Sequence, residues 1–346
     1  SKTWRTTGKA AAVSIVLDFG EETRLGASWS TVLYLGGANF RTALLRRWDG
    51  AAWQTLGTWD GATGFAGLGY ELHGNVIRPT AGTSTAGRWI NDGELVGWRA
   101  HLPSGKVRRV LRNSGGSWST ATTVRPELVL DGVDGTEAAS GVVDLVSPAG
   151  VLVVNQTSAS ANYTRYISLA IASGQDTPPD EDYYQIGVAL VGGLHAVGKQ
   201  WSDSWSLARD PNVAATVDTR GARQVRQLGP TSQSLTVAWQ DGQRLDAMRS
   251  AALDPDYLGT TAGAPLVAEH DVLGQLHGLQ VATLGGEIPV VALSVVPDAA
   301  SSFTSDRSLY TYGHLTSLRV QANVVTGEEN SSEFVRIESI TVQECV

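Results

Sequence analysis

Short stretches of alternating apolar and polar residues recur along this 346-residue chain, separated by residues that favour turns. In the clearest of them, 163–171 (YTRYISLAI), isoleucines and leucine alternate with polar or small residues. This period of two is the pattern of half-buried β-strands. Strands are predicted on this basis at 13–19, 30–35, 95–100, 107–111, 128–130, 142–146, 151–154, 163–171, 183–191, 201–207, 234–239, 289–296, 315–325 and 334–342.

Asp-Gly dipeptides mark turns between these strands. Asp49-Gly50 lies between Trp48 and Trp53, and it predicts a β-hairpin with a type I′ turn, because both residue types tolerate a positive φ. The same dipeptide recurs at 60–61, 92–93, 131–132, 134–135 and 241–242. Turns at this density predict antiparallel sheets.

Helical spacing is rare. Leu245, Met248 and Ala252 fall on one helical face, and Asp254-Pro255 would end that helix, so a helix is predicted over 244–253 with Leu245 and Met248 packed inward. A weaker helical stretch covers 266–276. The predicted fold class is therefore all-β: a β-sandwich followed by a second β-rich domain with one or two short helices.

The chain is expected to form two domains, 1–195 and 196–346, with residues 61–160 an elaboration of the first. The residue pattern and the balance of charged residues both change near residues 192–204, beside Gly192-Gly193. Residues 1–200 carry 17 Lys and Arg against 17 Asp and Glu, whereas residues 201–346 carry 9 against 17, which accounts for the net charge of −8. An acidic half argues against stable nucleic-acid binding, since phosphate contacts need Lys and Arg.

One cysteine, Cys345, excludes an intrachain disulfide and a cysteine-based zinc cluster. No apolar run approaches about 18 residues, so no membrane insertion is expected. No charged-then-apolar leader opens the chain, and removal of an initiator Met before Ser1 or trimming of a longer chain explains its start. Neither a cofactor nor a metal is expected.

Enzyme motifs are missing. The chain has no G-x-S-x-G elbow and no H-E-x-x-H pair, and Gly67-x-Gly69 lacks the rest of a dinucleotide motif. His270 and His277 are interpreted as surface histidines, and Asp131 with Asp134 as turn residues. We therefore expect no enzymatic activity. A polysaccharide depolymerase with a catalytic pair of carboxylates remains an alternative, because two such residues can be far apart in the sequence and meet only in the folded protein.

Eight of the eleven tryptophans lie in the first 120 residues. Trp53, Trp59 and Trp118 lie beside expected hairpin tips, where an exposed indole face would stack on a sugar ring, so they are the glycan-binding candidates. The alternative is that each indole fills a sandwich core.

Several segments resemble bacteriophage tail-tip or baseplate proteins. Thr3–Gly8, Val16–Gly20 and the W-D-G-x-x-W hairpin are similar to discoidin-like, galactose-binding jelly rolls, and 163–169 and 184–193 look like closing strands of that domain. Five later segments look like parts of the distal-tail-like domain of such proteins: Trp205–Leu207, Thr219–Gly221, Leu235–Trp239, Pro289–Leu293 and Leu309–His314.

The resemblance implies a virion structural protein, made in the host cytoplasm and located in the tail. It would form a ring with itself, a hexamer or trimer, as an adaptor between the tail tube and the baseplate hub or receptor-binding parts. A glycan-binding receptor module for the host surface is the alternative, and a tail-associated depolymerase a further one. The resemblance supplies no catalytic residue.

In such a ring an acidic channel would repel DNA phosphates. We expect this channel to be lined by several of the acids Asp203, Asp210, Asp218, Asp241, Asp246, Glu328, Glu329 and Glu333. The open alternative is that these acids are spread evenly over the outer surface.

Overall fold

A computed structural model describes part of the chain. The described residues are 3–24, 30–80, 89–118, 124–133, 135, 137–155, 163–178, 181–193, 205–210, 213–217, 223–227, 232–237, 243–244, 283–294, 301–307, 309–325 and 332–344. Within these residues the regular elements are all β-strands and none is a helix, which confirms the all-β class. The helix predicted over 244–253 begins at Arg244, which lies in strand β22 (Gln243–Arg244). Its remainder, with Leu245 and Met248, and the stretch 266–276 lie outside the described residues.

The chain divides into two compact units. The first comprises Ser1–Thr23, Ser30–Gly192 and Pro297–Ser305, and the second comprises Arg24–Trp29, Gly193–Val296 and Asp306–Val346. One division therefore falls at Gly192, close to the expected domain boundary at 195. The first unit also includes a short segment from far along the chain, which simple division into 1–195 and 196–346 did not foresee.

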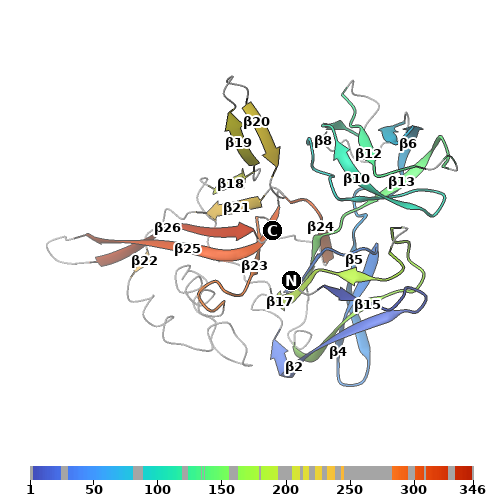
Figure 1. Cartoon of the computed structure of the whole chain (residues 1–346). Helices are drawn as coiled ribbons and strands as arrows, with labels where there is room; N and C mark the ends of the chain where they lie inside the picture. The colour runs from blue at the N-terminus through green and yellow to red at the C-terminus, as the bar shows by residue number, and fades with distance from the viewer. Residues whose placement is uncertain are drawn as a thin grey trace. The chain divides into compact units, whose positions relative to one another are not determined.

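A sandwich of two four-stranded sheets forms one part of the first unit (Figure 1). Trp59 of one sheet lies edge-on against Phe303 of the other, with ring centroids 5.4 Å apart, and Gly57 faces Leu152 and Val154 across the sandwich. The first sheet has the order β17 (Val188–Gly193), β3 (Ser30–Gly36), β14 (Gly150–Asn155) and β24 (Ser301–Thr304). The second has the order β2 (Val13–Arg24), β15 (Tyr163–Ile171), β4 (Thr42–Trp48) and β5 (Trp53–Asp60).

The apolar pattern explains these strands. Ile167, Leu169 and Ile171 alternate along β15 and are buried, as the period-2 reading of this stretch predicts. The continuous run Val151–Val154 in β14 is buried on both faces, which is typical of a central strand. A small ribbon of β1 (Trp4–Arg5) and β16 (Gln185–Ile186) accompanies the sandwich.

Residues between β5 and β14 form a separate closed barrel of six strands. This is the stretch expected as an elaboration of the sandwich. The order around the barrel is β10 (Val107–Asn113), β12 (Leu128–Leu130), β7 (Val76–Pro79), β6 (Leu68–His73), β13 (Ser140–Val146) and β9 (Arg99–His101). A two-stranded ribbon of β8 (Trp89–Ile90) and β11 (Gly116–Ser117) adjoins it.

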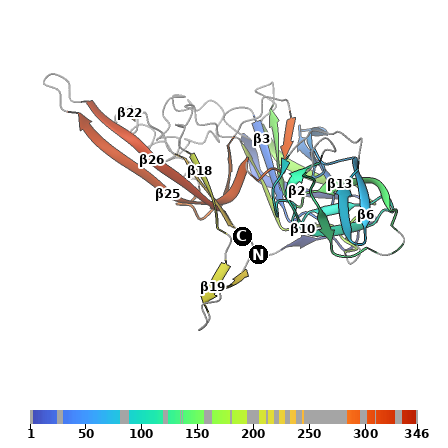
Figure 2. The ribbon, with the colours of Figure 1, turned by 90° about the horizontal axis from the view of Figure 1, so that it is seen from above.

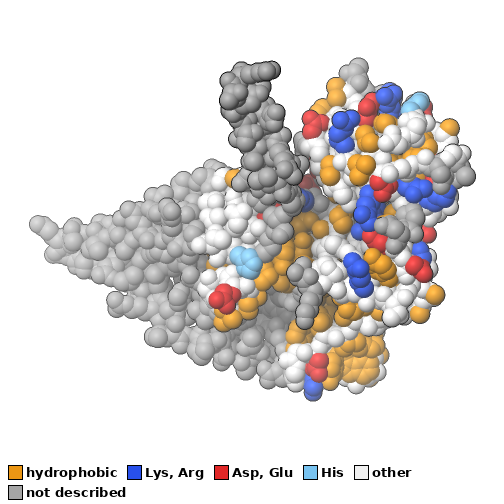
Figure 3. All heavy atoms as spheres, in the orientation of Figure 1, with side chains coloured by type: hydrophobic (Ala, Val, Ile, Leu, Met, Phe, Trp, Pro, Cys, Tyr) orange, Lys and Arg blue, Asp and Glu red, His pale blue; other side chains and the backbone are white. Residues whose placement is uncertain are grey.

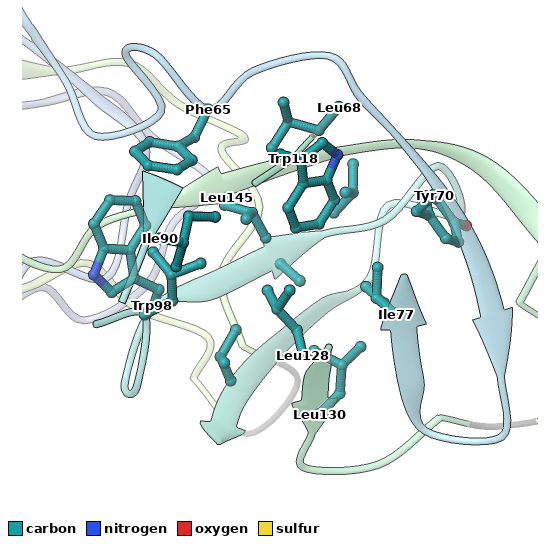
Figure 4. Close-up of a cluster of buried hydrophobic side chains, with 14 of the residues drawn as sticks. Phe65, Leu68, Tyr70, Ile77, Ile90, Trp98, Trp118, Leu128, Leu130 and Leu145 are labelled. Carbon is teal, nitrogen blue, oxygen red and sulfur yellow. The ribbon is translucent and has the colours of Figure 1, made fainter. Parts of the chain in front are cut away.

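The barrel has a hydrophobic core of its own (Figure 4). The core side chains all come from residues 65–145, and large members such as Tyr70, Trp98 and Trp118 are almost wholly buried. Burial of this much apolar surface stabilises the barrel independently of the sandwich. The barrel is therefore an inserted module with its own folding core.

The insertion leaves and re-enters the sandwich at one place. The amide of Gly61 donates to the carbonyl of Arg41 (3.0 Å), and the amide of Ser147 donates to the carbonyl of Gly61 (2.9 Å). A Cβ at Gly61 would lie 2.8 Å from the carbonyl oxygen of Ser147 and 2.9 Å from Val146 Cγ1, so only glycine fits between the two crossings.

The strand expected at 95–100 is wrong in its first half. Residues 92–97 form turns, and β9 begins only at Arg99. Gly93 and Gly97 adopt positive φ of 74° and 84°, and the side chain of Asn113 accepts the amide of Leu95 (2.9 Å). The apolar Leu95 therefore fills the barrel core from a turn.

In the second unit, a six-stranded sheet contains a long strand pair, β25 (Tyr310–Val325) and β26 (Ser332–Glu344) (Figure 2). The sheet order is β18 (Trp205–Asp210), β21 (Ser232–Val237), β26, β25 and β23 (Val290–Leu293), with β22 beside β26. A separate hairpin pairs β19 (Val213–Val217) with β20 (Arg223–Gln227).

The chain passes between the two units more than once. β24 follows β23 in the sequence, yet it pairs antiparallel with β14 of the sandwich, from Val151↔Thr304 to Val154↔Ser301. The chain then returns to form β25. The sandwich sheet is thus completed by a strand from near the C-terminal end of the sequence.

Candidate functional site

Two of the three tryptophan candidates are core residues, which corrects their assignment to a glycan surface. Trp59 is fully buried, and its indole Nε1 donates to the carbonyl of Gly150 (3.3 Å). Trp118 is 3% exposed and donates to the carbonyl of Gly69 (3.2 Å) inside the barrel module. Each ring is packed on both faces and its only donor is satisfied, so neither indole offers a face to a sugar.

Trp53, the third candidate, lies at the surface with 37% of its area exposed. It pairs across the β4–β5 hairpin with Trp48, edge to face, with ring centroids 5.5 Å apart. The structure does not bring the three candidates together, because Trp59 and Trp118 belong to two different cores.

The turn below Trp53 differs by one residue from the predicted type I′ turn. The amide of Asp49 donates to the carbonyl of Ala52 (3.1 Å), so Gly50 and Ala51 occupy the tip, and only Gly50 has a positive φ (98°). A type I′ turn needs a positive φ at both central residues, so the turn is not of that type. The Asp49 carboxylate accepts the amides of Ala52 and Ala51 and the side chain of Gln54, and these hydrogen bonds hold its pKa below the ordinary value.

A further exposed indole was not found from the sequence. Trp89 in β8 is 54% exposed, more than Trp53. It was not among the predicted glycan-binding residues, although the Asp92-Gly93 dipeptide begins three positions after it.

The structure does not test whether the eight acidic candidates line a channel. The backbones of Asp210 and Glu333 lie in β18 and β26, but their side chains are not described. The other six, Asp203, Asp218, Asp241, Asp246, Glu328 and Glu329, lie outside the described residues. On the face seen in Figure 3, acidic and basic side chains are interspersed over the first unit.

The most concentrated group of charged side chains lies where the barrel meets the sandwich. We call it the charged joint: Asn39, Arg41, Asp60 and Glu181 from the sandwich, and Arg99, His101, Arg109 and Asp144 from the barrel. Sequence reasoning missed this joint, because its members are scattered over more than 140 positions and share no spacing.

One half of the joint is built around Glu181. Its Oε1 accepts Arg109 Nη2 (2.5 Å) and its Oε2 accepts Asn39 Nδ2 (2.9 Å), so both carboxylate oxygens are used. Arg99, directly opposite Arg109 on the neighbouring strand, donates Nη1 to the carbonyl of Ala38. These contacts connect β9 and β10 of the barrel to two loops of the sandwich.

The other half is built around Arg41. Its guanidinium contacts Asp144 of β13 through Nη1 and Asp60 of β5 through Nε (3.4 Å). The second oxygen of Asp144 accepts the amide of Gly67 (2.6 Å). Asp144 also lies opposite His101 in the β13–β9 pairing. The joint therefore contains three guanidinium groups and three carboxylates.

Burial perturbs the two basic groups on β9. Arg99 is 7% exposed, and desolvation lowers its pKa to about 10, which leaves it charged at neutral pH. Desolvation, with the neighbouring Arg99 and Arg41, lowers the pKa of His101 to about 4. His101 is therefore uncharged at neutral pH, and within the described structure its buried Nε2 has no hydrogen-bond partner.

The described part of the chain contains no group of three or more His, Cys, Asp or Glu side chains placed to hold a metal ion. Nor does any helix there have the length and apolar character needed to cross a membrane. No known protein family, curated protein or solved structure matches this chain in sequence or fold comparisons.

Proposed function

We propose that this chain is a virion structural protein of a phage tail, which forms a ring or adaptor at the tail tip or baseplate. The resemblances of its N-terminal jelly-roll segments and its distal-tail-like segments suggest this role. The main support is an extension of the β25–β26 strand pair, which we call the arm. It consists of residues 314–325 of β25 and residues 332–339 of β26.

Among the described residues, no strand of the sheet pairs with most of the arm's two outer edges. β23 pairs only with Tyr310–Gly313, and β21 pairs with β26 only from Ile340 to Gln343. Over 314–325, the described partner of β25 is β26 alone, and β22 covers only Phe334 and Val335 on the far edge. At about 3.4 Å per residue, this edge is roughly 40 Å long.

Such an arm favours self-assembly. A two-stranded ribbon is only marginally stable by itself in water. The edge N–H and C=O groups that pair with no strand among the described residues are a template for another strand. A ring of identical chains supplies that strand at every subunit through one repeated head-to-tail contact. We expect a hexamer or trimer, contacting tail-tube and hub proteins.

Size-exclusion chromatography with light scattering tests the assembly. The test variant replaces residues 322–335 with Asn-Gly, so that the arm closes on the Gln321↔Arg336 pair. The control replaces 216–224 with Asn-Gly and shortens the β19–β20 hairpin to its Ala215↔Val225 pair. The parent and the control are expected to form rings and the shortened arm a monomer.

A parent chain that stays monomeric at high concentration would contradict the ring. Immuno-electron microscopy tests the location separately, with antibody against this protein applied to virions. Label gathered at the tail tip supports the proposal, and label on the capsid or none on the particle overturns it.

A glycan-binding receptor module is the second candidate function, and Trp53 supports it. Its exposed ring is held by Trp48 and by the hydrogen-bonded turn at Asp49, and a rigid aromatic face of this kind suits stacking on a sugar. A glycan array with parent, Trp53→Ala and the control Trp89→Ala tests it. Binding lost only in Trp53→Ala supports this function; no binding by the parent removes it. The depolymerase alternative stays a prediction.

A further inference from the structure

The charged joint holds together two parts of the first unit that have separate cores. The barrel core is made wholly from residues 65–145, while the sandwich core contains Trp59, Leu152 and Ile167. The covalent connection consists of two adjacent crossings at Gly61 and Ser147. The barrel is therefore attached by a narrow hinge and fastened beside it by ionic contacts.

We propose that the charged joint is an acid-sensitive latch, which docks the barrel on the sandwich at neutral pH and releases it in mildly acidic solution while both cores stay folded. This inference does not depend on the proposed tail function, since it rests on the first unit alone.

The balance of charge explains docking at neutral pH. Arg41, Arg99 and Arg109 are matched by Asp60, Asp144 and Glu181, and His101 adds no charge. The matching matters most at Glu181 and Arg99, which are 8% and 7% exposed, because removal of the partner of a buried ion leaves an uncompensated charge in a poorly solvated place. The pairs of Arg41 with Asp60 and Asp144 are partly exposed and contribute less. A proton added to the joint has the same effect as removal of a carboxylate.

His101 is the group positioned to take that proton. On its own strand it neighbours Arg99; β13 presents Asp144 opposite it, and the sandwich presents Arg41. On β10 its pairing partner is the apolar Val107, with Arg109 two residues further along. A second cation here would face two guanidinium groups and one carboxylate, which favours separation.

The direction of the pH effect follows from linkage. In the docked state burial, with Arg99 and Arg41 nearby, lowers the pKa of His101 to about 4. Release removes Arg41 and the burial against the sandwich, so the pKa of His101 rises toward its ordinary value of about 6.5. The released state therefore binds the proton more tightly, and docking weakens as pH falls from about 6.5 to about 4. The docking equilibrium constant decreases by up to about 300-fold across that interval, and His101 adds nothing more below it.

Distance measurement between two spin labels tests the latch on the full chain. Labels on Val96→Cys in the barrel and Thr55→Cys in β5, both exposed positions, report the separation in a Cys345→Ser background. Near-ultraviolet circular dichroism monitors the buried tryptophans in the same samples. We expect one narrow distance at pH 7.5, broadening between pH 6.5 and 4 without loss of the dichroism signal.

Two histidine variants form a matched pair. His101→Gln removes the proton site and should shift the broadening to lower pH, whereas His73→Gln alters an exposed histidine of the same barrel and should match the parent. Glu181→Gln removes the negative charge that binds Arg109 Nη2 and should broaden the distance already at pH 7.5. The latch is overturned if the parent distance stays narrow until the dichroism signal collapses, or if His101→Gln follows the parent. If His101→Gln does not fold, a narrow distance in Glu181→Gln at pH 7.5 also overturns it.

Discussion

At the residue scale, burial decides what each tryptophan does. Trp53 and Trp59 are six positions apart on one strand, yet one is exposed and the other fully buried. Alternation along β5 is interrupted by a register shift between Leu45 and Arg46 of its partner strand, so counting from the hairpin tip does not give the face of Trp59.

We expect Trp59→Ala to lower the free energy of unfolding by about 3–5 kcal/mol, because it empties a large site in the sandwich core. Trp53→Ala should cost about 1 kcal/mol or less, since only part of the ring is buried. Chemical denaturation followed by circular dichroism measures both. Equal losses would show that the two rings are buried alike in solution.

Gly61 is a second residue whose importance comes from its neighbours. In Gly61→Ala the new methyl group would press on the Ser147 carbonyl and Val146, and the two crossings would have to separate. We expect a loss of about 1–3 kcal/mol, as for overpacked sites. Gly135→Ala is the control, because no described residue apart from its chain neighbours has an atom within 4 Å of its Cβ position. Thermal melts of both variants provide the comparison, and a parent-like melt of Gly61→Ala would contradict the tight crossing.

At the element scale, the added strand β24 shows how a distant segment completes a sheet. Phe303 packs its ring against Trp59 and over Gly150, where a Cβ would lie 2.5 Å from the ring. The strand predictions from period-2 patterns passed over 301–304, because SSFT has no apolar alternation.

We therefore expect Phe303→Ala to destabilise the sandwich by about 2–4 kcal/mol, although its pairing partner Leu152 lies about 150 positions earlier in the chain. Hydrogen exchange of the β14 amides should accelerate in this variant and stay unchanged in Ser302→Ala on the same strand. Unchanged exchange in Phe303→Ala would mean that β24 is not needed to hold β14.

At the scale of the whole molecule, the inserted barrel should be removable. Gly61 and Ser147 are joined by a hydrogen bond of 2.9 Å, so a short Gly-Asn-Gly linker can replace residues 62–146 without moving the strands on either side. We expect the shortened chain to keep the strand content of the sandwich and to form the same ring, since the arm lies in the other unit. Circular dichroism and light scattering check this. Aggregation of the shortened chain would show that the sandwich depends on the barrel to fold.

The sequence by itself determined the all-β class and most strands, because alternation and turn residues act over only a few positions. Strands β12 and β15 have the bounds that the pattern predicts, and β4 and β5 flank the expected hairpin. The sequence predicted the candidate site much less well than the fold. Of three tryptophans selected by their nearness to turns, only Trp53 is at the surface.

Only the tertiary structure decided which strands close into a barrel, where β24 pairs and how the charged joint forms. Leu95 and Trp118 are apolar in any sequence pattern, but their burial depends on strands that return from elsewhere in the chain. Arg99 and Glu181 are 82 positions apart, and either would be an ordinary surface charge if the chain did not fold back there. Local patterns carry no information on such pairings, because the energy that fixes them comes from burial and charge matching between distant segments.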